Sequence, residues 1–300
     1  MRSAAATTPC RPTTAVLGLL LAACASGTPA YDPGQLDAER AAKCRAAEVA
    51  YRNEAPEYAT LRDELANDPI AVHWLVRMFV RDLILVREGR PIDDTAEMFM
   101  AAAGIENPVE RRAIGEIEAL GAKAAPTIVG DLLRHSQPQP RELGIELIAR
   151  IGDAALPDLL PLAHSGEPRE RRTAARALGM IGNAALVEDE LFRLAHDDDF
   201  TVRADAMRGL VRGSERGAAV LRATLATDPD PFVRRVAAQS LVRHPSPATA
   251  KALVDYLQRC QEGDDRQGEK AAQSSLQKLA GTRGMRTLAA WRAWLAEQGR

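Results

Sequence analysis

Histidines are the first residues to test for metal or acid–base chemistry, because imidazole both ligates metals and carries protons near neutral pH. The chain is built of repeating sequence units, each with two apolar segments. Three of the five histidines stand at the end of the second apolar segment in successive units: His135, His164 and His196. Stacked helices lie about 8–10 Å apart, whereas the ligands of one zinc ion each bind at about 2 Å. We therefore expect these histidines not to share a metal ion, and we predict no cofactor.

A run of three acids, Asp197-Asp198-Asp199, is the other candidate for a cation site. It lacks the spaced oxygen ligands of a calcium-binding loop. We predict instead that it forms a turn between units and caps the helix that follows.

The four cysteines, Cys10, Cys24, Cys44 and Cys260, include no C-x-x-C pair, so the zinc-finger and thioredoxin-like motifs are absent. In an exported protein Cys44 and Cys260 could form a disulfide. They stand near opposite ends of the chain, and we expect two unpaired thiols.

The amino-terminal segment has the composition of an export signal. Arg2 and Arg11 precede the apolar run at 15–23, AVLGLLLAA, which is far too short to cross a bilayer as a helix. The four residues Leu21-Ala22-Ala23-Cys24 resemble the lipobox of bacterial lipoproteins. In that family diacylglycerol is attached to the cysteine sulfur, and cleavage leaves the cysteine first. The resemblance implies a signal peptide at 1–23 and lipid attachment at Cys24.

An ordinary signal peptide is the alternative, because Ala23-Cys24-Ala25 also fits the small-x-small cleavage pattern and would release a soluble exported protein. The residue after the cysteine is Ala25 rather than aspartate, which resembles lipoproteins of the outer membrane. The implied location is the outer membrane, facing the periplasm. Residues 24–35 are small, polar and rich in proline and glycine, and we expect a flexible tether.

The composition favours helices. Apolar residues make up 46% of the 300 residues but aromatic residues only 4%, so alanine and leucine must form the core. The formal net charge is −2, and it becomes −4 without Arg2 and Arg11. This weak acidity argues against a nucleic-acid-binding protein, which would show a clustered basic face.

The chain repeats itself with a period of about 31 residues, seen where ELIARIGDAALPDLL at 146–160 is compared with ARALGMIGNAALVED at 175–189. A small residue and, four positions later, an aliphatic residue define one buried helix face in each unit. A glycine then predicts the end of the helix in the first three units, at Gly121, Gly152 and Gly182. The next two units have Ser214 and Pro245 there, so we expect their first helices to end earlier or to pack less well. The five units begin near Asn107, Gln137, Glu167, Asp198 and Asp230.

Two of these segments, DPFVRRVAAQSL at 230–241 and TVRADAMRGL at 201–210, resemble short HEAT-like repeats of the phycobilin-lyase type. The resemblance covers residues 107–260. It implies an all-α fold, an α-solenoid of about five to six helix-turn-helix repeats. A partial sixth repeat is expected within 261–300.

Helical caps are expected at both ends. In the amino-terminal cap, residues 36–106, the apolar segment 70–86 carries only a narrow polar stripe of His73, Arg77 and Arg81, which predicts a buried central helix. A docking helix for a partner is the alternative. At the carboxyl end one helical face carries Leu288, Trp291, Trp294 and Leu295. We expect this helix to cover the last repeat, and an exposed aromatic site is the alternative.

Four arginines recur at one position of the repeat: Arg141, Arg171, Arg203 and Arg234. Asp199 and Asp230 precede two of them. We predict a ladder of acid–arginine contacts between units. A positive stripe for an anionic partner is the alternative, which the acidic loops would oppose.

The sequence thus indicates a non-catalytic scaffold or adaptor of the bacterial cell envelope, anchored to the membrane, whose second helices bind a protein. It indicates no nucleic-acid partner and no small-molecule substrate. One alternative is an enzyme, either lyase-type or metal-dependent, but the chain lacks the His-Glu dipeptides that iron-dependent hydroxylases on HEAT-like repeats use as ligands. The other alternative is a purely structural envelope lipoprotein.

Overall fold

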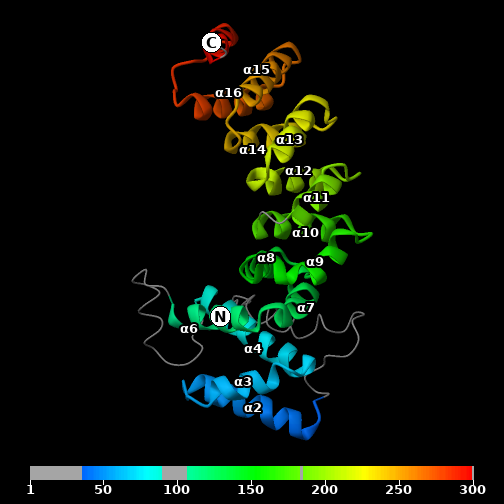
Figure 1. Ribbon diagram of the computed structural model, residues 1–300, viewed down its shortest axis with the longest axis vertical. Helices are drawn as coiled ribbons and strands as arrows, with labels where there is room; N and C mark the ends of the chain where they lie inside the picture. The colour runs from blue at the N-terminus through cyan, green and yellow to red at the C-terminus, as the bar shows by residue number, and fades with distance from the viewer. Residues whose placement is uncertain (1–35, 90–106, 183–184, 299–300) are drawn as a thin grey trace, which may run out of the picture. The chain divides into compact units, whose positions relative to one another are not determined.

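The computed structural model describes residues 36–89, 107–182 and 185–298 (Figure 1). The predicted signal peptide, the lipobox with Cys24 and the tether lie outside these residues. The chain forms two compact units, Met1–Pro140 and Arg141–Arg300. The division falls inside the predicted repeat segment 107–260.

The first unit is built around α4 (Pro69–Arg87), which packs against α2 (Ala38–Arg52) and α6 (Pro108–Leu120). Leu75, Val76 and Phe79 of α4 are buried, as expected of a central helix. Its polar stripe has partners: His73 Nδ1 lies 3.1 Å from Thr127 Oγ1, and Arg81 contacts Glu48. The other elements of this unit are α3 (Tyr58–Leu65), η3 (Gly121–Ala124), α7 (Ala125–Thr127) and η4 (Ile128–Leu133).

The second unit consists of successive helix pairs in which each pair packs on the next (Figure 1). First helices pack on first helices, as α10 does on α12 and α12 on α14, and second helices pack on second helices, as α13 does on α15. Sequential packing of this kind is the arrangement of an α-solenoid. The first helices are α8 (Pro138–Ile151), α10 (Pro168–Ile181), α12 (Phe200–Gly209), α14 (Pro231–Ser240) and α16 (Arg266–Ala280). The second helices are α9 (Leu156–Ala163), α11 (Ala185–Leu194), α13 (Glu215–Thr227), α15 (Pro247–Glu262) and α17 (Leu288–Gln298). No strand occurs among the described residues.

The ends of the helices follow local chemistry. Asp199 and Asp230 each accept hydrogen bonds from the backbone N–H groups that begin α12 and α14, which confirms the capping turn predicted for the acidic run. Gly121, Gly152 and Gly182 have positive φ angles of 54°, 71° and 106°, as a glycine helix stop requires.

The two units that lack this glycine have shorter first helices, as predicted. The helices α12 and α14 each have 10 residues, against 14 in α10. Each continues into one 3₁₀ turn, η6 (Leu210–Arg212) or η7 (Leu241–Arg243). The tighter turn brings the chain to the second helix without a left-handed residue.

Two helices approach each other closely at Gly179 of α10 and Gly209 of α12. A Cβ atom placed on Gly179 would lie only 2.4 Å from the Gly209 Cα atom, so the two backbones meet directly. The small residues that the repeat pattern singles out, such as Ala174 and Ala206, are buried between the same helices.

The last helix pair completes a sixth repeat. Helix α16 packs against α14 and α15, and α17 packs against α15 in the position of a second helix. Trp291 of α17 is fully buried and its Nε1 donates to Gln273 Oε1 at 3.3 Å, so this helix covers the array as predicted. Within the described ranges no helix is both long and apolar enough to span a bilayer.

Candidate functional site

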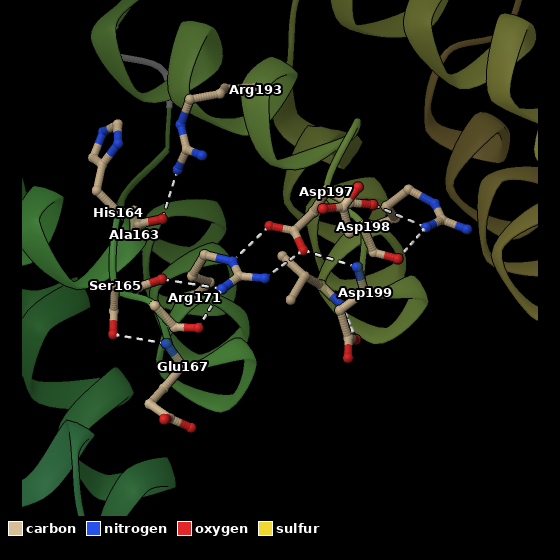
Figure 2. A network of polar contacts seen from close by, with 12 residues as sticks. Ala163, His164, Ser165, Glu167, Arg171, Arg193, Asp197, Asp198 and Asp199 are labelled. Carbon is tan, nitrogen blue, oxygen red and sulfur yellow. Dashed lines mark hydrogen bonds and ion pairs between the residues drawn. The ribbon is translucent and has the colours of Figure 1, made fainter.

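The loops between repeats carry a periodic polar network, which we call the loop ladder and define by Arg171, Arg203, Arg234, Asp197 and Asp228. In Figure 2, Arg171 lies between two loops. It donates to the Ser165 and Gly166 carbonyls of the preceding loop, both at 3.0 Å. Its other nitrogens donate to both carboxylate oxygens of Asp197, at 2.7 and 2.8 Å. One guanidinium therefore connects two successive loops.

The same contacts recur one repeat later. Arg203 donates to the carbonyls of Asp197 and Asp198, and to both oxygens of Asp228 at 2.9 and 3.1 Å. Arg234 donates to the Asp228 and Pro229 carbonyls. The predicted ladder of acid–arginine contacts is therefore present in this unit.

The acids of the ladder differ from those that the sequence suggested. Asp199 and Asp230 are occupied as helix caps, and the arginines reach Asp197 and Asp228, two residues earlier. Each of these carboxylates belongs to the loop that follows the arginine's own repeat. Sequence proximity pointed to the wrong acid because the contact depends on how neighbouring loops are stacked.

Hydrogen bonds favour the charged form of two acids in this loop, Asp197 and Asp199. Burial alone would raise the pKa of Asp197, but hydrogen bonds from Arg171 and from the Asp199 backbone N–H outweigh it, and the pKa is lowered. The hydrogen bond from the Thr201 hydroxyl lowers the pKa of Asp199. Both carboxylates are thereby held in the charged form.

A pH series tests the lowered pKa of Asp197. The folded-state pKa of Asp197 lies below its unfolded value of about 3.9. Its contribution to stability is therefore present above about pH 4 and is lost as the pH falls through the folded-state pKa. We expect the urea midpoints of the native chain and Asp197→Asn to differ by a constant amount from about pH 7 to pH 5, and to converge below about pH 4. A difference that persists undiminished to about pH 2 would contradict the lowered pKa.

The histidines do not converge. His135 Nδ1 accepts from the Gln137 backbone N–H at 3.1 Å, His164 Nε2 lies 3.2 Å from Glu190, and His196 Nδ1 lies 2.8 Å from the Phe192 carbonyl. No cluster of metal-ligating side chains occurs in the part of the chain that the structure describes. The three end second helices, as the sequence indicated, but each has its own local contact.

Cys44 and Cys260 are both buried and unbridged. Burial raises the pKa of Cys44 to about 11, and it also raises that of Cys260. Both thiols therefore stay protonated near neutral pH, which makes them poor nucleophiles.

A second feature was missed by the sequence analysis. We call it the Arg–Phe surface and define it by Arg172, Phe200, Arg208, Phe232 and Arg235, all on first helices. The two phenylalanine rings meet edge to face at 6.3 Å between centroids. The Arg208 and Arg235 guanidinium carbons lie 5.6 and 5.8 Å from the Phe232 centroid. Four of these five residues, all except Arg235, line an open pocket of about 280 Å³ together with Thr201.

The second helices, which the sequence favoured as the binding face, are rich in pairs of their own. Arg216 bonds Asp189 at 2.6 Å and lies over the Phe192 ring at 4.4 Å. Lys251 bonds Asp255 at 2.6 Å. Charges on this face are thus balanced locally, and binding there stays a prediction.

Comparison with known proteins identifies the repeat. The sequence model of the family described as HEAT repeats matches residues 125–211 and 188–277. The two overlapping matches together span residues 125–277, just over half of the chain. No curated protein matches the chain.

Proposed function

We propose that this chain, which belongs to the HEAT repeat family, is a non-catalytic scaffold that binds a protein while lipid anchors it at the bacterial cell envelope. HEAT repeats build extended surfaces that generally mediate protein binding. The observation that carries the proposal is the matched repeat array, whose stacked helix pairs present such a surface.

The anchor rests on the sequence alone. Leu21-Ala22-Ala23-Cys24 resembles a lipobox and follows a basic and then an apolar segment. Three acyl chains, as lipoproteins of two-membrane bacteria carry, exceed the two signals that stable anchoring needs. The proposed location of the chain is the outer membrane, on the side that faces the periplasm.

The enzyme alternative finds little support in the described side chains. Its histidines form separate local contacts, and its two buried cysteines are protonated. A purely structural envelope lipoprotein is the second alternative, and the Arg–Phe surface argues against it, because exposed aromatic and cationic groups in one place are typical of a binding surface.

Metabolic labelling with a fatty acid tests the anchor. We expect the native chain to incorporate label and to remain with the membrane, and Cys24→Ala to lose both properties. Ala25→Ser is a suitable control, because it leaves the cysteine in place. Equal labelling of the native chain and Cys24→Ala would refute lipid attachment at Cys24.

Crosslinking in native membranes followed by mass spectrometry tests the scaffold function. We expect a reproducible protein partner crosslinked to residues of the repeats. Failure to recover any reproducible partner would count against a scaffold and favour the structural alternative.

A further inference from the structure

The Arg–Phe surface is assembled from three first helices, α10, α12 and α14, and remains open to solvent. Phe200 is 43% exposed, although it is one of only five phenylalanines in the chain. The side chains of Arg172 and Arg208 are each 48% exposed. Aromatic residues and arginines are the residue types that dominate binding energy at protein interfaces.

A buried acid holds two of these arginines in place. Asp205 has only 2% of its side chain exposed, and it accepts from Arg172 of α10 at 2.6 Å and from Arg208 of its own helix. Each guanidinium has five N–H groups, so most of them stay available after one such contact. Asp205 therefore orients the arginines before any partner binds, which reduces the entropy lost on binding.

Positive charge extends from this surface onto α8 and α10. Arg169 is exposed, and no ion pair to it occurs within the described ranges. Burial lowers the pKa of Arg141, and the positive charges of Arg169, Arg172 and Arg176 lower it further, whereas the Glu142 carboxylate opposes this effect. Glu142 pairs with Arg176, and Asp205 pairs with Arg172.

The pocket sets the size of what could enter. Its volume of about 280 Å³ is at the lower limit of the range of about 300–1,000 Å³ for small-molecule sites. It has room for one apolar side chain against the Phe200 and Phe232 rings, with carboxylates reaching the surrounding arginines. The headgroup phosphates of a membrane would not fill such an apolar pocket. The contacts with Glu142 and Asp205 show that these arginines bind carboxylates.

We infer that the Arg–Phe surface docks an acidic segment of a protein partner, in which aspartates or glutamates flank one aromatic or large aliphatic side chain. This inference rests on the proposed scaffold function and names the chemistry of the partner. The carboxylates would accept paired hydrogen bonds from the arginines, and the apolar side chain would fill the pocket.

Selection of random peptides displayed on phage against the full chain tests the inference. We expect the enriched peptides to share an aromatic or aliphatic residue between acids. A synthetic peptide of the most enriched sequence should bind at least tenfold more weakly to Arg208→Glu and to Phe232→Ala, as expected when an interface anchor is removed. Circular dichroism and the thermal midpoint would show that both variants remain folded.

The matched control is the other arginine–phenylalanine pair. Arg216→Glu and Phe192→Ala alter a similar pair on the second helices, and we expect them to change peptide affinity less than twofold. Peptides without the acidic pattern, or equal losses in the control variants, would overturn the inference. Vesicles of phosphatidylglycerol test lipid as the ligand. If Cys24→Ala bound them and the further substitution Arg208→Glu abolished that binding, the surface would be a lipid site and the inference would be overturned.

The two proposals can fail separately. A crosslinked partner whose capture is unaffected by Arg208→Glu and Phe232→Ala would preserve the scaffold function and refute this docking site. If the peptide bound the native chain but neither variant, and crosslinking in the membrane recovered no partner, the docking chemistry would be supported and the scaffold function refuted.

Discussion

Replacement of Arg203 by alanine is expected to lower the free energy of unfolding of the second compact unit by about 3 kcal/mol. The variant leaves the Asp228 carboxylate, whose side chain is 6% exposed, without its two charged hydrogen bonds. It also removes the donors to the carbonyls of Asp197 and Asp198. Urea unfolding followed by circular dichroism measures the loss.

The matched control is Arg216→Ala. Arg216 also pairs with an aspartate, Asp189, but the two side chains are 68% and 58% exposed, so the change should stay within about 0.5 kcal/mol. Arg203→Lys should fall between the two, because lysine keeps the charge but cannot form the paired contact. Equal effects of Arg203→Ala and Arg216→Ala would show that the loop ladder adds no stability beyond that of an exposed pair.

The location of the loss can also be tested. In a repeat array each repeat contacts only its neighbours, so the damage should be greatest in the repeats that the missing contact connects. Hydrogen exchange in Arg203→Ala should therefore accelerate most in α12 and α14 and least in α9.

The loop ladder illustrates how far the sequence alone could go. The period predicted which arginines are equivalent, and the structure confirms that two of them bond aspartates of the next loop. The sequence could not identify the aspartates, because Asp197 and Asp199 occur in one short run and only the stacking of the loops decides which of them faces Arg171. The helix stops, by contrast, depend on one residue each, and Gly121, Gly152 and Gly182 were all identified.

The Arg–Phe surface escaped the repeat analysis for a different reason. Phe200 stands three residues before Arg203, whereas Phe232 stands two residues before Arg234, so the two rings occupy different positions of the repeat. A comparison at the 31-residue offset of these arginines therefore does not align the two rings. Their contact arises because α12 and α14 lie side by side, which brings the ends of the two helices together.

Gly179→Ala, at the crossing of α10 and α12, is the second substitution for which we expect a large loss of stability. A Cβ atom there would lie 2.4 Å from the Gly209 Cα atom, and because the obstacle is backbone, the two helices would have to separate. Overpacking of this kind costs about 1–3 kcal/mol, which exceeds the gain in helix propensity of about 1 kcal/mol. We expect a net loss of up to about 2 kcal/mol in urea unfolding.

Two other glycines separate backbone contact from helix propensity. Gly209→Ala should cost less than Gly179→Ala, since its Cβ first meets the flexible Leu191 side chain at 2.8 Å. Gly115→Ala has no atom within 4 Å and should stabilise α6 of the first unit by up to about 1 kcal/mol, seen as slower hydrogen exchange. If Gly179→Ala were as stabilising as Gly115→Ala, the backbones of α10 and α12 could not be in contact. The order Gly179, Gly209, Gly115, from most to least destabilising, therefore tests how closely two neighbouring repeats are packed.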